Sequence, residues 1–177
     1  MQIRKATKQD IPGIARVYQL CWREQYGAFV PSDIFESLAI GQDARWENIL
    51  DASTYGDEVA FVAEENSEII GYASGGPEWG GHPSIEAELY SLYVMNGHQG
   101  KGLGKRLLQS VAAALQSMSM NSMLVHLRSG NPTPRVYNAL GAEYLGTQAI
   151  SVDGVTIQEM TYGWKDLKKL TESSEKN

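Results

Sequence analysis

A glycine-rich segment at residues 99–105 (QGKGLGK) lies between the strongest strand pattern and the strongest helix pattern of this 177-residue chain. Before it, residues 87–95 (AELYSLYVM) are typical of a strand because apolar and aromatic residues dominate. After it, apolar residues recur at helical spacing, at Leu103, Leu107, Leu108, Val111, Ala112 and Leu115. A strand, a glycine-rich turn and a helix in direct succession predict a βαβ crossover.

The remaining patterns predict one mixed α/β domain at residues 1–166, followed by a polar C-terminal tail at 167–177. Asn66 and Ser67 supply the polar turn of a hairpin, and Thr7 with Asp10 forms a capping pair that opens the first helix. We expect further strands at residues 2–6, 59–63, 69–73, 123–127, 143–152 and 155–164, and helices at 11–21, 32–40, 43–50 and 133–140. This order predicts an α/β (α+β) fold, in which helices flank a central mixed, mostly antiparallel sheet with a βαβ core.

Composition excludes several classes of protein. Fifteen Lys and Arg against 21 Asp and Glu give a net charge of −6, which disfavours nucleic acid as a partner. The single cysteine, Cys21, cannot form an intramolecular disulfide, and no histidine has metal-ligand spacing, so we predict no metal. The apolar stretches are far shorter than the roughly 20 residues of a membrane span, and the charged first ten residues do not resemble a signal peptide. These features predict a cytoplasmic protein with no membrane partner.

The glycine-rich segment is suited to anion binding. Backbone N–H groups at a helix start attract phosphate, and Lys101, Lys105 and Arg106 add positive charge. The segment is not a P-loop, because Leu103 stands where that motif needs lysine. It is not a dinucleotide fingerprint either, because Lys105 stands where the third glycine belongs. The alternative is a turn that only connects two elements.

The segment does fit the pattern Gln/Arg-x-x-Gly-x-Gly/Ala. Together with ELYSLYV before it and Asn131, Tyr137, Leu140 and Gly141 after it, it resembles the GNAT superfamily of acetyl-CoA-dependent N-acetyltransferases. The order of elements agrees over about residues 1–164, and the specific motifs lie between Glu88 and Gly141. The resemblance implies a GNAT-like fold and direct transfer of an acetyl group from acetyl-CoA to an amine. Many proteins of this family are dimers, so a homodimer is an option that the sequence leaves open.

The resemblance also implies a cofactor site. In this family the strand before the loop pairs with the pantetheine arm through its backbone, the loop holds the diphosphate, and an asparagine near the mouth of the slot contacts the arm. The implied acetyl-CoA-binding residues are Leu92, Tyr93, Val94, Gln99, Gly100, Lys101, Gly102, Leu103, Gly104, Lys105 and Asn131. Pro134 departs from the family's usual small residue, which leaves contacts from that turn in doubt.

Two residues match catalytic positions of the family. A phenol such as Tyr137 can protonate a departing thiolate, although a core aromatic residue is the alternative. Glu88 matches a glutamate that takes the proton of the attacking amine, and its alternatives are an exposed strand residue or an anchor for a substrate ammonium. Glu86 is a reserve candidate for the base. His126 lies within a strand and is either packed or directed into the cleft.

The acceptor is expected to be a small-molecule amine, such as a polyamine, an amino acid or an amine antibiotic. The alternatives are acetylation of a protein N-terminus or lysine, and a non-catalytic acyl-CoA sensor. Cys21 lacks an evident activating partner, so no acyl-enzyme is expected. Candidates for lining the acceptor pocket, each equally compatible with a core or surface role, are Trp22, Glu24, Tyr26, Phe29 and Trp79.

Overall fold

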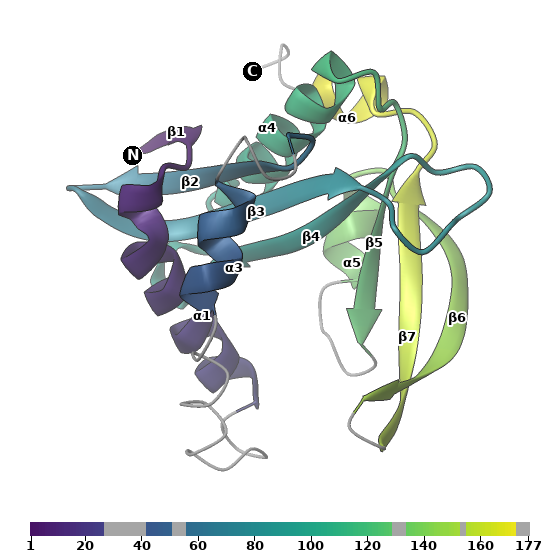
Figure 1. Cartoon of the computed structure of the whole chain (residues 1–177), viewed down its shortest axis with the longest axis horizontal. Coiled ribbons are helices and arrows are strands. Elements are labelled where there is room, and N and C mark those ends of the chain that lie inside the picture. The colour runs from purple at the N-terminus through teal and green to yellow at the C-terminus, as the bar shows by residue number, and fades with distance from the viewer. Residues whose placement is uncertain (27–41, 51–55, 129–133, 153–154, 173–177) are drawn as a thin grey trace. The chain divides into compact units, whose positions relative to one another are not determined.

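The computed structural model describes residues 1–26, 42–50, 56–128, 134–152 and 155–172. The chain divides into two compact units, one of Met1–Gly75 with Ser91–Val111 and one of Gly76–Tyr90 with Ala112–Asn177. Its seven strands are hydrogen-bonded in the order β1-β2-β3-β4-β5-β7-β6 (Figure 1). The expected mixed, mostly antiparallel sheet with flanking helices is therefore confirmed. The helix expected at 32–40 lies outside the described residues.

The first unit is built on an antiparallel hairpin. Strand β1 (Gln2–Lys5) pairs with β2 (Val59–Glu65), which pairs with β3 (Glu68–Pro77). The hairpin turn forms at the predicted residues, Asn66 and Ser67, with φ of 51° and 64°. Two successive positive φ values match the turn type whose twist suits a two-residue hairpin.

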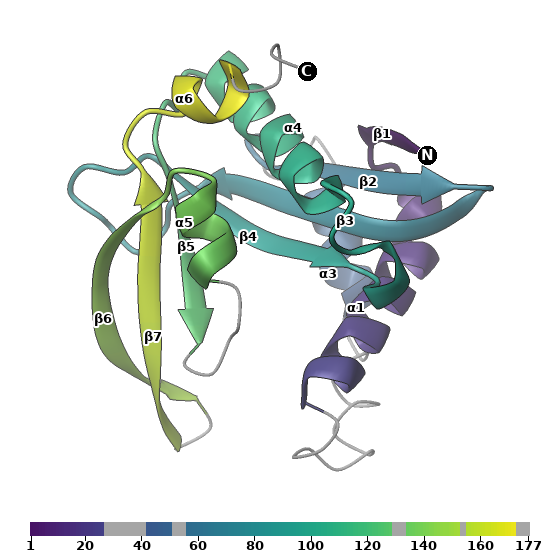
Figure 2. The same cartoon turned by 180° about the vertical axis from the view of Figure 1, so that it is seen from behind.

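Helices cover both faces of this hairpin. Helices α1 (Ile11–Tyr26) and α3 (Gln42–Ile49) lie on one face of β2 and β3, and α4 (Leu103–Ser117) lies on the other (Figures 1 and 2). The helices predicted at 11–21 and 43–50 are thus present. The 3-10 turn η1 (Lys8–Asp10) precedes α1.

A β-bulge shapes the core of the first unit. Ala63 pairs with Gly71 but Glu64 pairs with Ile69, so Ile70 is an extra residue in β3. The extra residue reverses the alternation of side chains. As a result Ile69 and Tyr72, three positions apart, both join the apolar cluster built on α1, with Ile11, Ile14, Val17, Cys21, Trp46, Ala60 and Val62.

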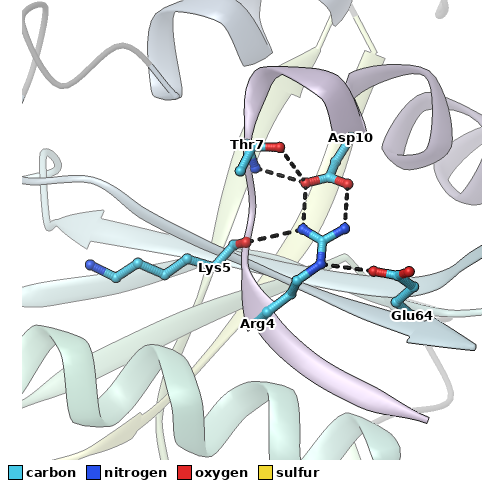
Figure 3. A network of polar contacts seen from close by, with 5 residues as sticks. All are labelled: Arg4, Lys5, Thr7, Asp10 and Glu64. Atoms are coloured by element: carbon cyan, nitrogen blue, oxygen red, sulfur yellow. Dashed lines mark hydrogen bonds and ion pairs between the residues drawn. The ribbon is translucent and has the colours of Figure 1, made fainter. Parts of the chain in front are cut away.

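An ion pair to the buried carboxylate of Asp10 fixes the entry into α1. Asp10 is 7% exposed, and both of its carboxylate oxygens accept hydrogen bonds from Arg4, at 2.7 Å each (Figure 3). The backbone N–H of Thr7 donates to the same carboxylate at 2.8 Å, which is the predicted capping contact. Arg4 also donates to Glu64 of β2 at 2.8 Å. The network therefore joins β1, β2 and the start of the helix.

This network predicts a pH-dependent stability. The hydrogen bonds from Arg4 lower the pKa of Asp10 from 3.8 to about 2. A lowered pKa adds stability that is complete above the unfolded value, near 4, and is lost as the pH falls through about 2. We expect Asp10→Asn to lower the free energy of unfolding by about 2 kcal/mol at pH 7. The difference from wild type should shrink between about pH 4 and pH 2.

Denaturant unfolding of both proteins from pH 7 to pH 2 measures this effect. Glu64→Gln is the matched control, because it removes the other carboxylate that contacts Arg4 while leaving Asp10 in place. Stability curves for wild type and Asp10→Asn that run parallel below pH 4 would contradict the assignment.

The second unit contains the C-terminal strands. Strand β5 (Met123–Arg128) pairs antiparallel with β7 (Val155–Trp164), which pairs with β6 (Glu143–Val152). Helix α5 (Pro134–Ala139) lies against this sheet (Figure 2). The indole of Trp164 donates to the carbonyl of Leu140 at 2.9 Å, just after α5. The predicted strands thus form at the predicted positions.

The first residues of the polar tail expected at 167–177 are part of the fold in the structure. Residues Lys168–Thr171 form the short helix α6, and Leu167 and Leu170 are 0% and 2% exposed. The N–H of Leu167 donates to the carbonyl of Asn121 at 2.9 Å. Two apolar residues three positions apart form too short a pattern to predict a helix from sequence. The burial of both side chains nevertheless holds residues 167–170 in the fold.

Candidate active site

The loop before α4 has the backbone that its glycines predict. Strand β4 (Ala87–Val94) is followed by the turn η2 (Asn96–His98), and α4 starts at Leu103. Gly100 and Gly102 have φ of +73° and +76°, a left-handed conformation that costs most side chains about 1–2 kcal/mol. A Cβ on either glycine would meet nothing within 4 Å. The loop therefore presents bare backbone toward open space.

Backbone donors are available where α4 starts. The N–H of Arg106 donates to the carbonyl of Gly102 at 3.1 Å, the first hydrogen bond of the helical pattern. The N–H groups of Leu103, Gly104 and Lys105 come before it, and such groups have no acceptor within their own helix. Together with the partial positive charge of a helix start, they suit the diphosphate of a coenzyme A thioester.

The other predicted loop residues have structural contacts as well. Gln99 donates from Nε2 to the carbonyl of Val94 at 2.8 Å, and Lys101 donates from Nζ to the carbonyl of Gly97 at 3.0 Å. Leu103 is 1% exposed, so its side chain anchors the helix start in the core. These contacts hold the loop closed on itself.

The side chain of Tyr93 belongs to an aromatic cluster. Its hydroxyl accepts a hydrogen bond from the indole of Trp22 at 3.1 Å, and its ring stacks edge-on with Tyr18 at 5.5 Å. A second ring, Tyr72, lies 5.5 Å from Tyr93. Trp22, expected as a pocket residue, is thus part of this packing. A role of residue 93 in cofactor binding would be carried by its backbone.

Cys21 is unsuited to nucleophilic catalysis. Burial, with a smaller contribution from the charge of Glu24, raises the pKa of its thiol to about 11. At neutral pH the thiol is therefore protonated, which is the form that does not attack a thioester. This agrees with the expectation that no acyl-enzyme forms.

Strands β4 and β5 share a short parallel register. In the part of the chain that the structure describes, it comprises Ala87 with Met123 and Glu88 with Leu124, although β4 has eight residues and β5 six. Every residue of β5 pairs with β7 on its other side. The short pairing is compatible with the implied separation of the two strands, and a cofactor slot between them stays a prediction.

Register assigns Glu88 to a defined face of the sheet in the second unit. Paired residues on neighbouring strands point to the same side, and alternate residues of one strand share a side. Glu88 therefore shares a face with its partner Leu124 and with His126, two residues further along β5. Thr161, the partner of His126, and Glu159 lie on this face of β7. We call it the Leu124 face.

A pocket of about 270 Å³ opens on the Leu124 face. It combines residues of β5, β6 and β7 with the connection between β3 and β4, and its lining residues are Glu78, Gly80, Gly81, His82, Leu124, His126, Leu145, Gly146, Thr147, Gln148 and Thr161. Its volume is near the lower end of the roughly 300–1,000 Å³ that is usual for small-molecule sites. We call it the β5–β7 pocket.

His126 is held firmly in this pocket. Its Nδ1 lies 3.0 Å from Thr161 Oγ1 and 3.5 Å from Glu159 Oε2. Gln148 in turn donates to Glu159 Oε2 at 3.2 Å. The sequence left open whether His126 is packed or directed into a cleft, and the structure places it in the pocket lining.

Glu78 organises the opposite wall. Its carboxylate accepts hydrogen bonds from the backbone N–H groups of Gly80 and His82, at 2.6 and 2.8 Å. Trp79, another expected pocket residue, is 69% exposed and donates to the hydroxyl of Tyr90 at 2.8 Å. The reserve base Glu86 accepts a hydrogen bond from the backbone N–H of Asn121 at 2.6 Å, so its carboxylate has a structural contact.

Tyr137 packs on the other side of the same sheet. It is 6% exposed, and its ring centroid lies 6.0 Å from that of Trp164. Trp164 pairs with Met123, the neighbour of Leu124, so it points away from the Leu124 face. The packing matches the core-aromatic alternative, and the role of Tyr137 as a proton donor stays a prediction. Asn131 and Phe29 lie outside the described residues, as does the side chain of Tyr26.

The described residues contain no group of three or more His, Cys, Asp or Glu arranged to hold a metal ion. No helix among them is both long enough and apolar enough to cross a membrane.

Comparison with known proteins decides the family. The sequence model of the "Acetyltransferase (GNAT) family" matches residues 14–142. The chain belongs to the GNAT family. The resemblance drawn from the loop and its flanking segments is thus confirmed, and with it the expectation of an acetyl-CoA-dependent N-acetyltransferase.

Several relatives of this GNAT protein have known names. It is 31% identical to the uncharacterized N-acetyltransferase YuaI of Bacillus subtilis strain 168, over 95% of each chain. It is 30% identical to the L-amino acid N-acyltransferase MnaT of Escherichia coli K12, over 74% of this chain and 72% of MnaT. It is 28% identical to an L-methionine sulfoximine/L-methionine sulfone acetyltransferase of Salmonella typhimurium LT2, over 80% and 79% of the two chains.

Solved structures show the same fold at lower identity. The PaiA N-acetyltransferase of Thermoplasma acidophilum, in complex with coenzyme A, aligns with a TM-score of 0.69 and 19% identity. The alignment covers 92% of this GNAT chain and 98% of the other.

Proposed function

We propose that this protein acetylates the primary amine of a small molecule and that amino acids and their analogues are the acceptor class. The β5–β7 pocket carries this proposal, because it is small, is lined by both polar and apolar residues and lies on the same sheet face as Glu88. The names of MnaT and of the methionine sulfone acetyltransferase support an acceptor of this kind. A polyamine, an amine antibiotic or a protein amine would be a different outcome of the test below.

The acetyl donor is proposed to bind at the β4–α4 junction. The backbone of Leu92, Tyr93 and Val94 would hold the pantetheine arm, Asn131 would contact that arm, and the loop from Gln99 to Lys105 would hold the diphosphate. The bare left-handed glycines and the N–H groups at the start of α4 fit that group. Acetyl-CoA supplies the activated acetyl thioester.

Two side chains would move protons. A primary ammonium has a pKa near 10, so it must lose a proton before its nitrogen can attack. Glu88, on the Leu124 face, is the proposed general base that accepts a proton from this nitrogen. Tyr137 is the proposed acid that returns a proton to the departing thiolate.

Calorimetric titration of acetyl-CoA into the purified protein tests the donor site. We expect one-to-one binding in the micromolar range, with clearly weaker binding of a pantetheine fragment that lacks the diphosphate. The loop is only a turn if neither ligand binds, and the proposed donor site would then be wrong.

A second assay separates the possible acceptors. Release of free thiol from acetyl-CoA is measured with L-methionine sulfone, L-methionine, spermidine or a peptide with a free N-terminus. We expect the two amino-acid compounds to be acetylated fastest. Binding of acetyl-CoA without transfer to any amine would instead support a non-catalytic sensor.

A further inference from the structure

We propose that His126 is a second proton-accepting residue of the acceptor pocket and that Glu159 and Thr161 position it. This inference deepens the proposed function and rests on it, because it takes the β5–β7 pocket as the site of the acceptor amine. His126 contributes to the lining of that pocket, which also contains Leu124, the strand partner of Glu88.

The contacts of His126 Nδ1 determine whether Nε2 of the same ring can accept a proton. Nδ1 faces the Thr161 hydroxyl at 3.0 Å and the Glu159 carboxylate at 3.5 Å. A carboxylate beside one ring nitrogen favours the tautomer that carries its proton there. Nε2 of the neutral ring then keeps its lone pair and accepts a proton.

The side chain of Glu159 is held in place by a hydrogen bond and is largely buried. Gln148 donates to its Oε2, the atom that faces His126, and the side chain is 16% exposed. The carboxylate stabilises the imidazolium once His126 has taken a proton. Because Glu159 acts through the ring, it is a positioning residue, and so is Thr161.

The reaction requires two proton acceptors. The ammonium of a primary amine carries three hydrogens and the product amide only one, so two protons leave the nitrogen. Glu88 takes the first, which leaves the neutral amine with the lone pair that forms the bond to the acetyl carbon. His126 Nε2 takes the second as that bond forms and the carbon–sulfur bond breaks. The sulfur keeps the electron pair of the broken bond and receives one proton, so one proton is released overall.

Spacing along the sheet permits both groups to reach one nitrogen. Neighbouring strands lie roughly 4.8 Å apart, and residues two apart on a strand are separated by roughly 6.6 Å. Glu88 is the strand partner of Leu124, and His126 follows two residues later on the same face. In the proposed complex the amine lies between the two side chains, and His126 returns its proton to water.

Steady-state kinetics of wild type, His126→Gln and Glu159→Gln test the proposal, with acetyl-CoA and L-methionine sulfone as substrates from pH 6 to pH 10. We expect His126→Gln to lower kcat about 100-fold, at the lower end of the range for a general base, with little change in KM for acetyl-CoA. Glu159→Gln should lower kcat less, with little change in KM for acetyl-CoA, because the imidazole loses the carboxylate that orients it while Nε2 remains. The other charged or titratable groups around His126 are Glu78, His82, Glu88 and Arg128, all retained in both variants.

The matched control for Glu159→Gln is Glu143→Gln. Glu143 lies on β6 outside the pocket lining, is 63% exposed and forms an ion pair with Lys165 at 2.8 Å. Its loss should leave kcat and the pH profile unchanged. An unchanged kcat and pH profile in His126→Gln, with an active wild type, would overturn the role of His126 while the proposed function stands.

An NMR measurement tests the same inference without turnover. Nitrogen-15 spectra of the imidazole of His126 at pH 8 should show the proton on Nδ1 in wild type. A proton on Nε2 would overturn the proposal, because that nitrogen could not then accept one. A wild type that binds acetyl-CoA but does not acetylate L-methionine sulfone would instead count against the proposed acceptor class, and the tautomer would still decide on His126.

Discussion

Replacing Glu88 with glutamine is expected to lower kcat about 1,000-fold at neutral pH, in the middle of the range for a general base. Glutamine keeps the size of the side chain, so the strand pairing of residue 88 with Leu124 is preserved. What it removes is the carboxylate that takes the proton of the substrate ammonium. Only amine that is already neutral in solution could then react.

This loss has a signature in the pH profile. Because the acceptor ammonium has a pKa near 10, the neutral fraction rises about tenfold for each pH unit below that value. The optimum of Glu88→Gln should therefore move upward. Its affinity for acetyl-CoA should stay nearly unchanged, because the proposed binding residues of the donor are at the β4–α4 junction. Initial rates from pH 6 to pH 10 and calorimetry measure the two effects.

Glu86→Gln is the matched control for this variant. Glu86 lies two residues earlier in the chain, and its carboxylate accepts the N–H of Asn121. Its replacement should lower stability slightly without moving the pH optimum. If Glu88→Gln turns over like wild type across the pH range, Glu88 is not the base.

Replacing Gly102 with valine is expected to weaken acetyl-CoA binding about 30-fold or more. Gly102 has φ of +76°, and a β-branched residue is a genuine outlier there. A cost of about 2 kcal/mol for the left-handed backbone corresponds to about a 30-fold change in an equilibrium constant. The loop relieves this strain by changing its backbone conformation. That change moves the N–H groups at the start of α4 away from the diphosphate. The new side chain also projects into the open space beside the loop.

Calorimetry with acetyl-CoA measures this loss, and two controls separate its causes. Gly141→Val places the same residue at φ of +87° outside the loop, so it should lower stability but leave acetyl-CoA affinity unchanged. Gly97→Ala adds a methyl group before the loop, where nothing lies within 4 Å and φ is not in the left-handed range. Unchanged affinity in Gly102→Val would show that the loop does not bind the diphosphate.

The predictions from sequence succeeded where the signal is local. The hairpin turn at Asn66 and Ser67, the glycine-rich loop before α4 and the apolar stripe of α4 each depend on residues close together in the chain. The order of these elements was enough to predict the fold class, and the loop together with the segments before and after it was enough to indicate the family. Both follow because turn chemistry and hydrophobic period are set by neighbouring residues.

The tertiary structure decided which side chains share a face and which are buried. The bulge at Ile70 changes which face of the sheet the following residues point to, and the sequence pattern did not predict it. His126 meets Thr161, 35 residues away, through the register of β5 with β7. Such a register depends on how whole strands pack, so the sequence determined the glycine-rich loop of the proposed donor site and only the folded sheet decided the β5–β7 pocket.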